Sequence, residues 1–353
     1  MRRILDIRHH KDDYECMWNG IEDLYLTKTG ESIPNGFFFA LSGYGNFIYL
    51  KSEKNELKRM LFFGDGRTRQ MYDRLKDIVG FTYRCTQGKT FADTLEKAKG
   101  EIDCGHPVVL GALDMYELPY DPKRYHRAHI PIHYVLMTGY DDERRSVFVL
   151  DCGRTELQEL SFDALERALD IEPTPMSKSN SICCVRMEHP AGRREIAWNA
   201  LREKAGLFLH PPISSLGYRG FCRLAAEFPR WREEFSPDDY RKCLMHIAMF
   251  TGTVPVLPNR LAGIDAPDEV PHMASRERLS EVLTVLGKEF DRPAMIRSGG
   301  ILLESGRRIE AFAGIVTDSL AGEGDRCEQA GAILLEAAEL EKEAYETLLI
   351  ALR

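Results

Sequence analysis

Two residues in the middle of this 353-residue chain, His133 and Asp151, are of types that do chemistry together. They lie near the ends of the stretch from Ile132 to Cys152, in which two apolar runs rich in Val, Leu, Tyr and Phe flank five consecutive charged residues. Such a pattern predicts a β-hairpin with a solvent-exposed tip. A carboxylate beside an imidazole can hold one ring nitrogen and leave the other to act as a base.

The register of this hairpin decides how His133 and Asp151 meet. Folding about residue 142 places them directly opposite each other, with Cβ atoms roughly 5 Å apart. Folding about residue 143 makes the pair diagonal, but still on one face of the hairpin. Either register predicts a histidine–aspartate pair.

A base of this kind needs a nucleophile, and the candidate is Cys16. Asp12 or Asp13 is suited to cap a helix there, since apolar residues recur at helical spacing in Trp18, Ile21, Leu24 and Tyr25. The first turn of a helix carries positive partial charge and free N–H groups, which favour a thiolate and can bind an oxyanion. The acidic residues around Cys16 act in the opposite direction.

The nine cysteines contain no CxxC motif, and scattered cysteines are commonly small buried hydrophobic residues. That plainer interpretation also applies to Cys16. We take the other eight as structural: Cys85, Cys104, Cys152, Cys183, Cys184, Cys222, Cys243 and Cys327.

A loop crowded with aromatic residues and histidines precedes the hairpin. It follows an apolar run, His106 to Asp114, that predicts a central strand. Loops beside strand ends often carry function, so we expect substrate-binding residues among Tyr116, Tyr120, Tyr125 and His129. The alternative is that these rings only cover apolar surface.

Composition excludes several classes of protein. The formal charge of −8 argues against non-specific nucleic-acid binding, and no apolar run approaches the roughly 20 residues of a membrane span. The N-terminus lacks the apolar segment of a signal peptide, so we expect a reducing, cytoplasmic setting. Cysteine and histidine spacings predict no metal site, and nothing indicates a cofactor.

The chain predicts two domains, because 44% apolar residues in a chain of this length suffice for two cores. Residues 1–188 mix strands and helices, which predicts an α+β domain with a central antiparallel sheet. Residues 188–194 have linker composition. Helical spacing then predicts an all-α domain over residues 195–353.

Several of these features resemble a known family. A cysteine on an N-terminal helix, followed by histidine and aspartate on an antiparallel sheet, is similar to the papain-like arrangement of cysteine peptidases and acyltransferases. More narrowly, the segment from Asp114 to Tyr120, then Tyr125, His129, His133 and Gly139 to Asp141, resembles the butirosin biosynthesis protein H family. The resemblance covers most of residues 10–188, and more loosely 215–231 and 297–312. It implies a papain-like domain followed by a helical domain.

The resemblance implies that an acyl group moves from an acyl carrier protein, or another thioester donor, to a small-molecule amine in natural-product biosynthesis. Cys16 would be the nucleophile, His133 the base and Asp151 the group that orients it. His10 stands where papain-like enzymes usually carry a glutamine that stabilises the oxyanion. The alternatives are a cysteine peptidase or amidase with the same triad, and a catalytically inactive scaffold. A homo-oligomer is left open.

Two further expectations concern the surroundings of the site. An acidic carrier protein needs a basic surface, for which the nearest cluster is Arg67, Arg69, Arg74 and Lys76. A thioester intermediate must be shielded from water, so we expect a lid formed by residues 116–129 or by the proline-rich residues 251–271.

Overall fold

The computed structural model describes residues 1–12, 16–43, 47–62, 68–172, 177–250, 275–322, 324 and 326–353. The proline-rich residues 251–271 lie outside these ranges. The chain divides into two compact units. Unit 1 comprises Met1–Phe39 with Arg67–Ile196, and unit 2 comprises Ala40–Gly66 with Ala197–Arg353.

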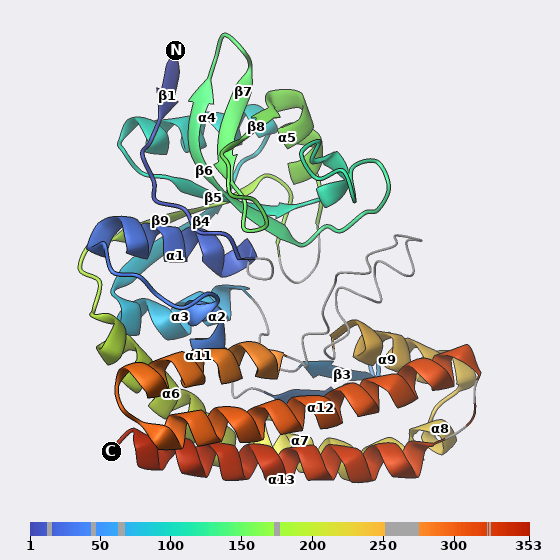
Figure 1. Cartoon of the computed structure of the whole chain (residues 1–353). Helices are drawn as coiled ribbons and strands as arrows, with labels where there is room; N and C mark the ends of the chain where they lie inside the picture. Colours follow the sequence, from blue (N-terminus) through green and yellow to red (C-terminus); the bar gives the residue numbers. More distant parts are fainter. Residues whose placement is uncertain are drawn as a thin grey trace. The chain divides into compact units, whose positions relative to one another are not determined.

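Within the described residues, unit 1 is built on an antiparallel seven-stranded sheet (Figure 1). Along its main path the strands are β4 (Phe81–Gln87), β9 (Ser181–Met187), β5 (Val108–Leu113), β6 (His133–Asp141), β7 (Ser146–Leu150) and β8 (Gln158–Ser161). A further strand, β1 (Arg2–Ile4), pairs with the far end of β6. The structure is therefore α+β with a central antiparallel sheet, as the sequence predicts.

The β6–β7 hairpin forms where the sequence predicts it, but in the second of the two registers. Leu136 pairs with Leu150, which centres this part of the hairpin on residue 143. An irregularity between Met137 and Gly139 shifts the register of the pairs nearer the tip of the hairpin. Every residue of both strands is buried, because β5 and β1 pair with β6 on its other edge.

The helices of unit 1 are α1 (Cys16–Thr29), α3 (Thr68–Val79), α4 (Phe91–Asp103) and α5 (Phe162–Leu169), with a 3-10 turn, η1 (Met115–Glu117). Helix α2 (Phe37–Leu41) begins in unit 1 and ends in unit 2. Side-chain caps fix two helix starts. The Thr90 hydroxyl accepts a hydrogen bond from the Asp93 N–H, and the Ser161 hydroxyl accepts one from Ala164.

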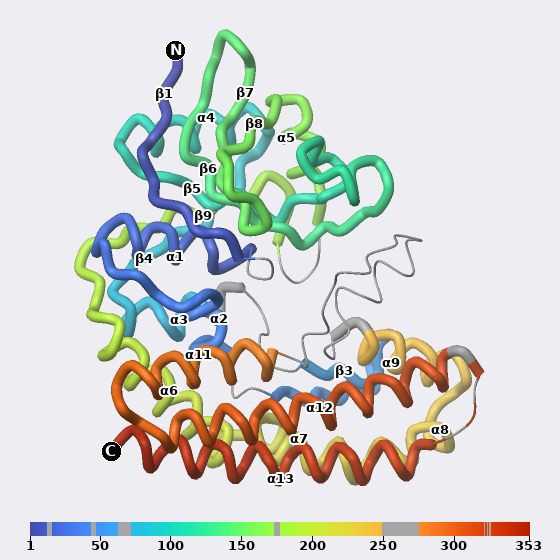
Figure 2. The backbone as a smooth tube through the Cα atoms, in the orientation of Figure 1, coloured from blue at the N-terminus to red at the C-terminus, as the bar shows by residue number. Residues whose placement is uncertain are grey.

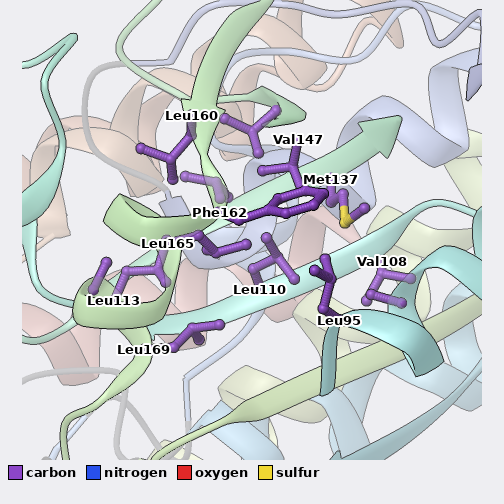
Figure 3. Packing of buried hydrophobic residues seen from close by; sticks show 14 of the residues in the cluster. Leu95, Val108, Leu110, Leu113, Met137, Val147, Leu160, Phe162, Leu165 and Leu169 are labelled. Atoms are coloured by element: carbon purple, nitrogen blue, oxygen red, sulfur yellow. The ribbon is translucent and has the colours of Figure 1, made fainter. Parts of the chain in front are cut away.

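One hydrophobic core lies between the sheet and helices α4 and α5 (Figure 3). Leu95 of α4 and Leu165 of α5 pack with Leu110 of β5 and Val147 of β7, and all four are buried. These residues follow the alternation of strands and the three-to-four spacing of helices. The core thus fixes the sheet that carries His133.

Unit 2 is mainly helical. Its helices are α6 (Arg193–Leu209), α7 (Gly217–Glu227), η2 (Phe228–Arg230), α8 (Trp231–Glu234), α9 (Pro237–Phe250), α11 (Arg276–Glu289), α12 (Pro293–Ala321) and α13 (Cys327–Ala351). The long helices α12 and α13 run alongside each other (Figure 2). A buried ion pair, Arg276 with Glu341 at 2.6 Å, joins α11 to α13, and the Ser305 hydroxyl of α12 donates to the same carboxylate.

Unit 2 also contains strands that the sequence did not predict as part of it. Strands β2 (Ile48–Lys51) and β3 (Arg59–Phe62) form an antiparallel pair. The ring of Phe47 stacks on Phe221 with centroids 4.4 Å apart, and the Leu61 N–H donates to His246 at 3.0 Å. The compact units therefore differ from the expected division into residues 1–188 and 195–353, because residues 40–66 pack with the helical part.

No helix in the described ranges has both the length and the apolar character needed to cross a membrane.

Candidate functional site

Cys16 is the first residue of α1, as the sequence predicts, and its side chain is half-buried. The helix approaches β6 closely one turn later, at Gly20. A Cβ atom on Gly20 would lie 3.1 Å from the Cβ of Leu136, so this position has little room for a side chain. The close approach sets the start of α1 near His133, three residues before Leu136 on β6.

His133 and Asp151 meet in the interior, with 6% and 5% of their surfaces exposed. His133 Nε2 donates to Asp151 Oδ2 at 2.8 Å. Because β7 ends at Leu150, Asp151 begins the turn after the strand and reaches His133 from there. The predicted pair is present, in the diagonal arrangement.

Asp151 accepts two further hydrogen bonds. The Tyr120 hydroxyl donates to Oδ2 at 3.0 Å, and the Gly153 N–H donates to Oδ1 at 3.3 Å. Burial favours the neutral acid, but the charge of His133 and these hydrogen bonds outweigh it and lower the pKa of Asp151 to about 2. Asp151 is therefore a carboxylate at neutral pH.

His133 links this carboxylate to Cys16. Burial alone would lower the pKa of His133, yet the charge and hydrogen bond of Asp151 and a side-chain hydrogen bond with Cys16 hold it well above its usual value. Since Asp151 occupies Nε2, Nδ1 is the ring nitrogen left for Cys16. The Cys16 sulfur also lies 4.0 Å from the Ile132 carbonyl oxygen. The structure thus brings Cys16, His133 and Asp151 together.

Tyr120 has a different environment from the one expected. The sequence placed it among the substrate-binding residues, but its hydroxyl is used by Asp151. Burial and the neighbouring carboxylate raise the pKa of Tyr120 well above its usual value. Tyr120 is therefore a partner of Asp151, and substrate binding by Tyr120 remains a prediction beside that contact.

The other three predicted substrate-binding residues gather in one ring stack on the loop before β6. Tyr116 stacks on His129 with centroids 4.0 Å apart, and Tyr125 stacks on His126 at the same distance. His129 Nδ1 is 2.7 Å from Asp114 Oδ2, which holds the stack to the end of β5. Substrate binding by Tyr116, Tyr125 and His129 remains a prediction.

His10 is not placed to stabilise an oxyanion. Its Nδ1 is 2.8 Å from Asp23 Oδ1, and its Nε2 is 2.9 Å from Glu22 Oε2. Burial would lower its pKa, but these two carboxylates raise it to about 10. Both N–H groups of the resulting imidazolium are already used, so the role expected from the position of His10 is corrected.

His9, which sequence reasoning missed, forms a similar contact. Its Nδ1 is 2.6 Å from Asp23 Oδ2, and its Nε2 is 2.8 Å from the carbonyl oxygen of Arg154. A carbonyl and a carboxylate only accept, so both nitrogens carry protons and the ring is charged. Burial opposes this charge, but Asp23 raises the pKa of His9. His9 thereby ties α1 to the turn that begins at Asp151.

A cue for this cluster exists in the sequence. Two adjacent histidines precede α1, and two adjacent acidic residues, Glu22 and Asp23, interrupt its apolar spacing. Opposite charges of this kind are candidates for pairing when a helix is buried. We call His9, His10, Glu22 and Asp23 the α1 ion cluster.

Two members of the α1 ion cluster, together with Asp12, contain donor atoms suited to a metal ion, although the sequence predicted no metal site. Among the described residues, His10, Asp12 and Glu22 place one ligand atom each within 4.8 Å of one another. A metal there would have to replace the proton shared between His10 and Glu22.

The expected carrier-protein surface is described only in part. Arg67 lies outside the described residues, and the side chain of Arg69 is not among those described. Lys76 forms an ion pair with Asp73 at 2.9 Å. This surface remains a prediction.

Comparison with known families adds a second line of information. Residues 15–152 match the family model described as butirosin biosynthesis protein H, N-terminal. Residues 163–253 match a domain of unknown function, DUF4872. The two matches, in this order along the chain, confirm the resemblance to the butirosin biosynthesis protein H-like family that the sequence shows. The first match contains Cys16, His133 and Asp151, whereas His10 lies before it.

A curated relative is the uncharacterized protein YobF of Bacillus subtilis (strain 168). It is 30% identical over 156 residues, which is 44% of this chain and 48% of the relative. The chain thus spans about half the length of the relative it matches. The description of this relative names no activity.

Proposed function

We propose that this protein is a cysteine-dependent acyltransferase with a papain-like arrangement of Cys16, His133 and Asp151. It would move an acyl group from a thioester, such as an acyl carrier protein, to a small-molecule amine in natural-product biosynthesis. The observation that carries the proposal is that His133 contacts Asp151 through one nitrogen and interacts with Cys16. The family description, which names a protein of butirosin biosynthesis, supports a biosynthetic role, and acyl transfer is what the resemblance to that family implies.

The first half-reaction begins with the Cys16 thiolate and the protonated His133. The sulfur attacks the carbonyl carbon of the donor thioester, and a tetrahedral oxyanion forms. The N–H groups at the start of α1 are the donors best suited to hold it, since both N–H groups of His10 are used elsewhere. The carbon–sulfur bond to the donor then breaks, and the departing thiolate takes the proton from His133.

In the second half-reaction, neutral His133 acts as the base. It removes a proton from the amine as the amine nitrogen attacks the acyl-Cys16 carbonyl. The new amide leaves, and the Cys16 thiolate with protonated His133 is restored. Asp151 stays ionised throughout and stabilises the imidazolium, which agrees with its lowered pKa of about 2.

The same three groups also serve a peptidase or amidase, in which water replaces the amine. Nothing in the geometry of Cys16 favours water, and the family description names a biosynthetic protein. An inactive scaffold would have no need for a buried histidine shared between a carboxylate and a thiol. We therefore keep acyl transfer as the proposal and use the other two as outcomes of the test.

The test uses an acyl-pantetheine thioester and intact-mass measurement. We expect an acyl adduct that persists for minutes without an amine, is absent in Cys16→Ala and is retained in Cys104→Ala, since Cys104 is an exposed cysteine outside the site. Addition of an amine acceptor should discharge the adduct as an amide. Discharge to free acid without accumulation would favour the hydrolase, and the absence of any adduct or turnover would favour the scaffold.

A further inference from the structure

Two cysteines other than Cys16 lie opposite each other on adjacent strands of the unit 1 sheet. Cys85 on β4 and Cys183 on β9 are direct partners in the antiparallel register. Their sulfur atoms are 2.7 Å apart. Opposite residues in antiparallel strands have Cα atoms about 4.5–5.5 Å apart, which lies within the range that a disulfide bridges.

One of these two thiols can be reached from solvent. Cys85 is half-buried and lines a surface pocket of about 540 Å³. The pocket is also lined by Asp73, Lys76, Asp77, Phe81, Thr82 and Tyr83. Cys183 is only 7% exposed. A small oxidant therefore meets Cys85 first, with Cys183 behind it.

The neighbouring Cys184 provides an internal control. Successive side chains of a strand point to opposite faces, and Cys184 pairs with Arg84 instead of Cys85. It lines a different pocket, together with Glu101 and Arg186. Burial and the charge of Glu101 raise the pKa of Cys184 to about 11, so its thiolate is scarce at neutral pH.

We propose that Cys85 and Cys183 form a reversible oxidation site in which a cross-strand disulfide joins β4 to β9. With hydrogen peroxide as oxidant, the Cys85 thiolate attacks one oxygen, and sulfenic acid and water are produced. The Cys183 sulfur then attacks the sulfenic sulfur, the S–S bond forms and a second water leaves. Two thiols lose two electrons, and one peroxide gains them. This site does not depend on the acyl-transfer proposal.

The experiment uses the reduced full-length protein. After removal of reductant, it is treated with equimolar hydrogen peroxide, blocked with N-ethylmaleimide and digested with trypsin without reduction. Cleavage after arginine and lysine releases residues 85–89 and residues 179–186 as separate peptides. We expect these two peptides joined, two hydrogens lighter than their sum, with Cys184 carrying the maleimide. Dithiothreitol should separate them.

Two matched variants assign the bond. Cys184→Ser should retain the joined peptides, and Cys183→Ser should lose them. Because the wild-type digest already identifies the bond, the proposal can be judged even if Cys183→Ser fails to fold. Oxidation of the exposed Cys104 while Cys85 and Cys183 both carry maleimide would overturn it, and so would a bond between Cys183 and Cys184.

Discussion

The described part of unit 1 contains two buried groupings of histidine with carboxylate, and they differ in how the imidazole nitrogens are used. In the α1 ion cluster, His9 and His10 each place both nitrogens on acceptors. His133 places only Nε2 on Asp151 and interacts with Cys16. All three histidines have raised pKa values. A raised pKa therefore does not by itself mark a catalytic histidine. What distinguishes His133, for which we propose the role of base, is the ring nitrogen left for Cys16.

The number of imidazole nitrogens that are hydrogen-bonded to acceptors decides what each histidine can do. A histidine with both protons committed is a fixed cation, and here it neutralises Glu22 and Asp23, which are fully buried. A histidine with one committed nitrogen keeps its orientation and can still exchange a proton. The α1 ion cluster joins α1 to the turn after β7. These two segments carry Cys16 and Asp151, the two residues that His133 contacts.

The largest effect that would test this comparison is on activity. His133→Ala should lower the rate of acyl adduct formation by about 10³- to 10⁴-fold, because both the base and the cation beside the thiolate are lost. The matched variant His10→Gln should lower it far less, since His10 does not contact Cys16 in the proposed mechanism. Adduct formation followed by intact mass measures both rates. Equal losses in the two variants would contradict the distinction.

The second effect is on stability. His10→Gln should lower the free energy of unfolding by about 3 kcal/mol at neutral pH, because Glu22 and Asp23 lose a buried cation. The folded pKa of about 10 exceeds the unfolded value of 6.5, so this stabilisation is complete below pH 6.5 and lost as pH rises through 10. Urea unfolding from pH 7 to 10 measures it.

Between pH 7 and 10 the free energy of unfolding should fall more steeply in the wild type than in His10→Gln. The difference in slope should be up to about 1.4 kcal/mol per pH unit. Other groups titrate in both proteins, so the difference between the two slopes isolates His10. Parallel slopes would mean that His10 is neutral in the folded protein.

The smallest effect concerns Tyr120. Tyr120→Phe removes one hydrogen bond from the Asp151 carboxylate and should raise the pKa of Asp151 above its value of about 2. The acid limb of Cys16 alkylation by iodoacetamide should then move to higher pH, with less than about a tenfold change in rate at pH 7. Tyr116→Phe, in the half-buried ring stack away from Asp151, is the control. An unchanged acid limb would show that Tyr120 only packs beside Asp151.

The sequence allowed the hairpin, the start of α1 and the meeting of His133 with Asp151 to be predicted, because each depends on local periodicity and short-range geometry. The role of His10 was misjudged for the opposite reason. The position of His10 before Cys16 suggested an oxyanion donor. The acidic residues that bind His10, Glu22 and Asp23, lie 12 and 13 residues later in α1, and only the folded chain brings them next to the imidazole. The irregularity in β6 that shifts the register was likewise not predictable from the pattern of apolar and polar residues.

The packing of residues 40–66 could not be predicted for a similar reason. Strands β2 and β3 are four residues each, and their partners in unit 2 come more than 150 residues later in the chain. Short strands carry little periodicity, and nothing in Phe47 or Tyr49 indicates which helix they contact. Burial explains the arrangement afterwards, since both rings are fully covered.

The same arrangement has a consequence during synthesis on a ribosome. Residues 40–66 emerge long before α7 and α9, and at usual elongation rates the wait between Phe47 and Phe221 is roughly 10–30 s. Throughout that interval the side chains of Phe47, Tyr49 and Leu61 lack the helices that bury them in the folded protein. The nascent chain therefore exposes an apolar segment between the two sequence segments of unit 1. We therefore expect this short apolar segment to stay accessible on the nascent chain until the helices of unit 2 have been synthesised.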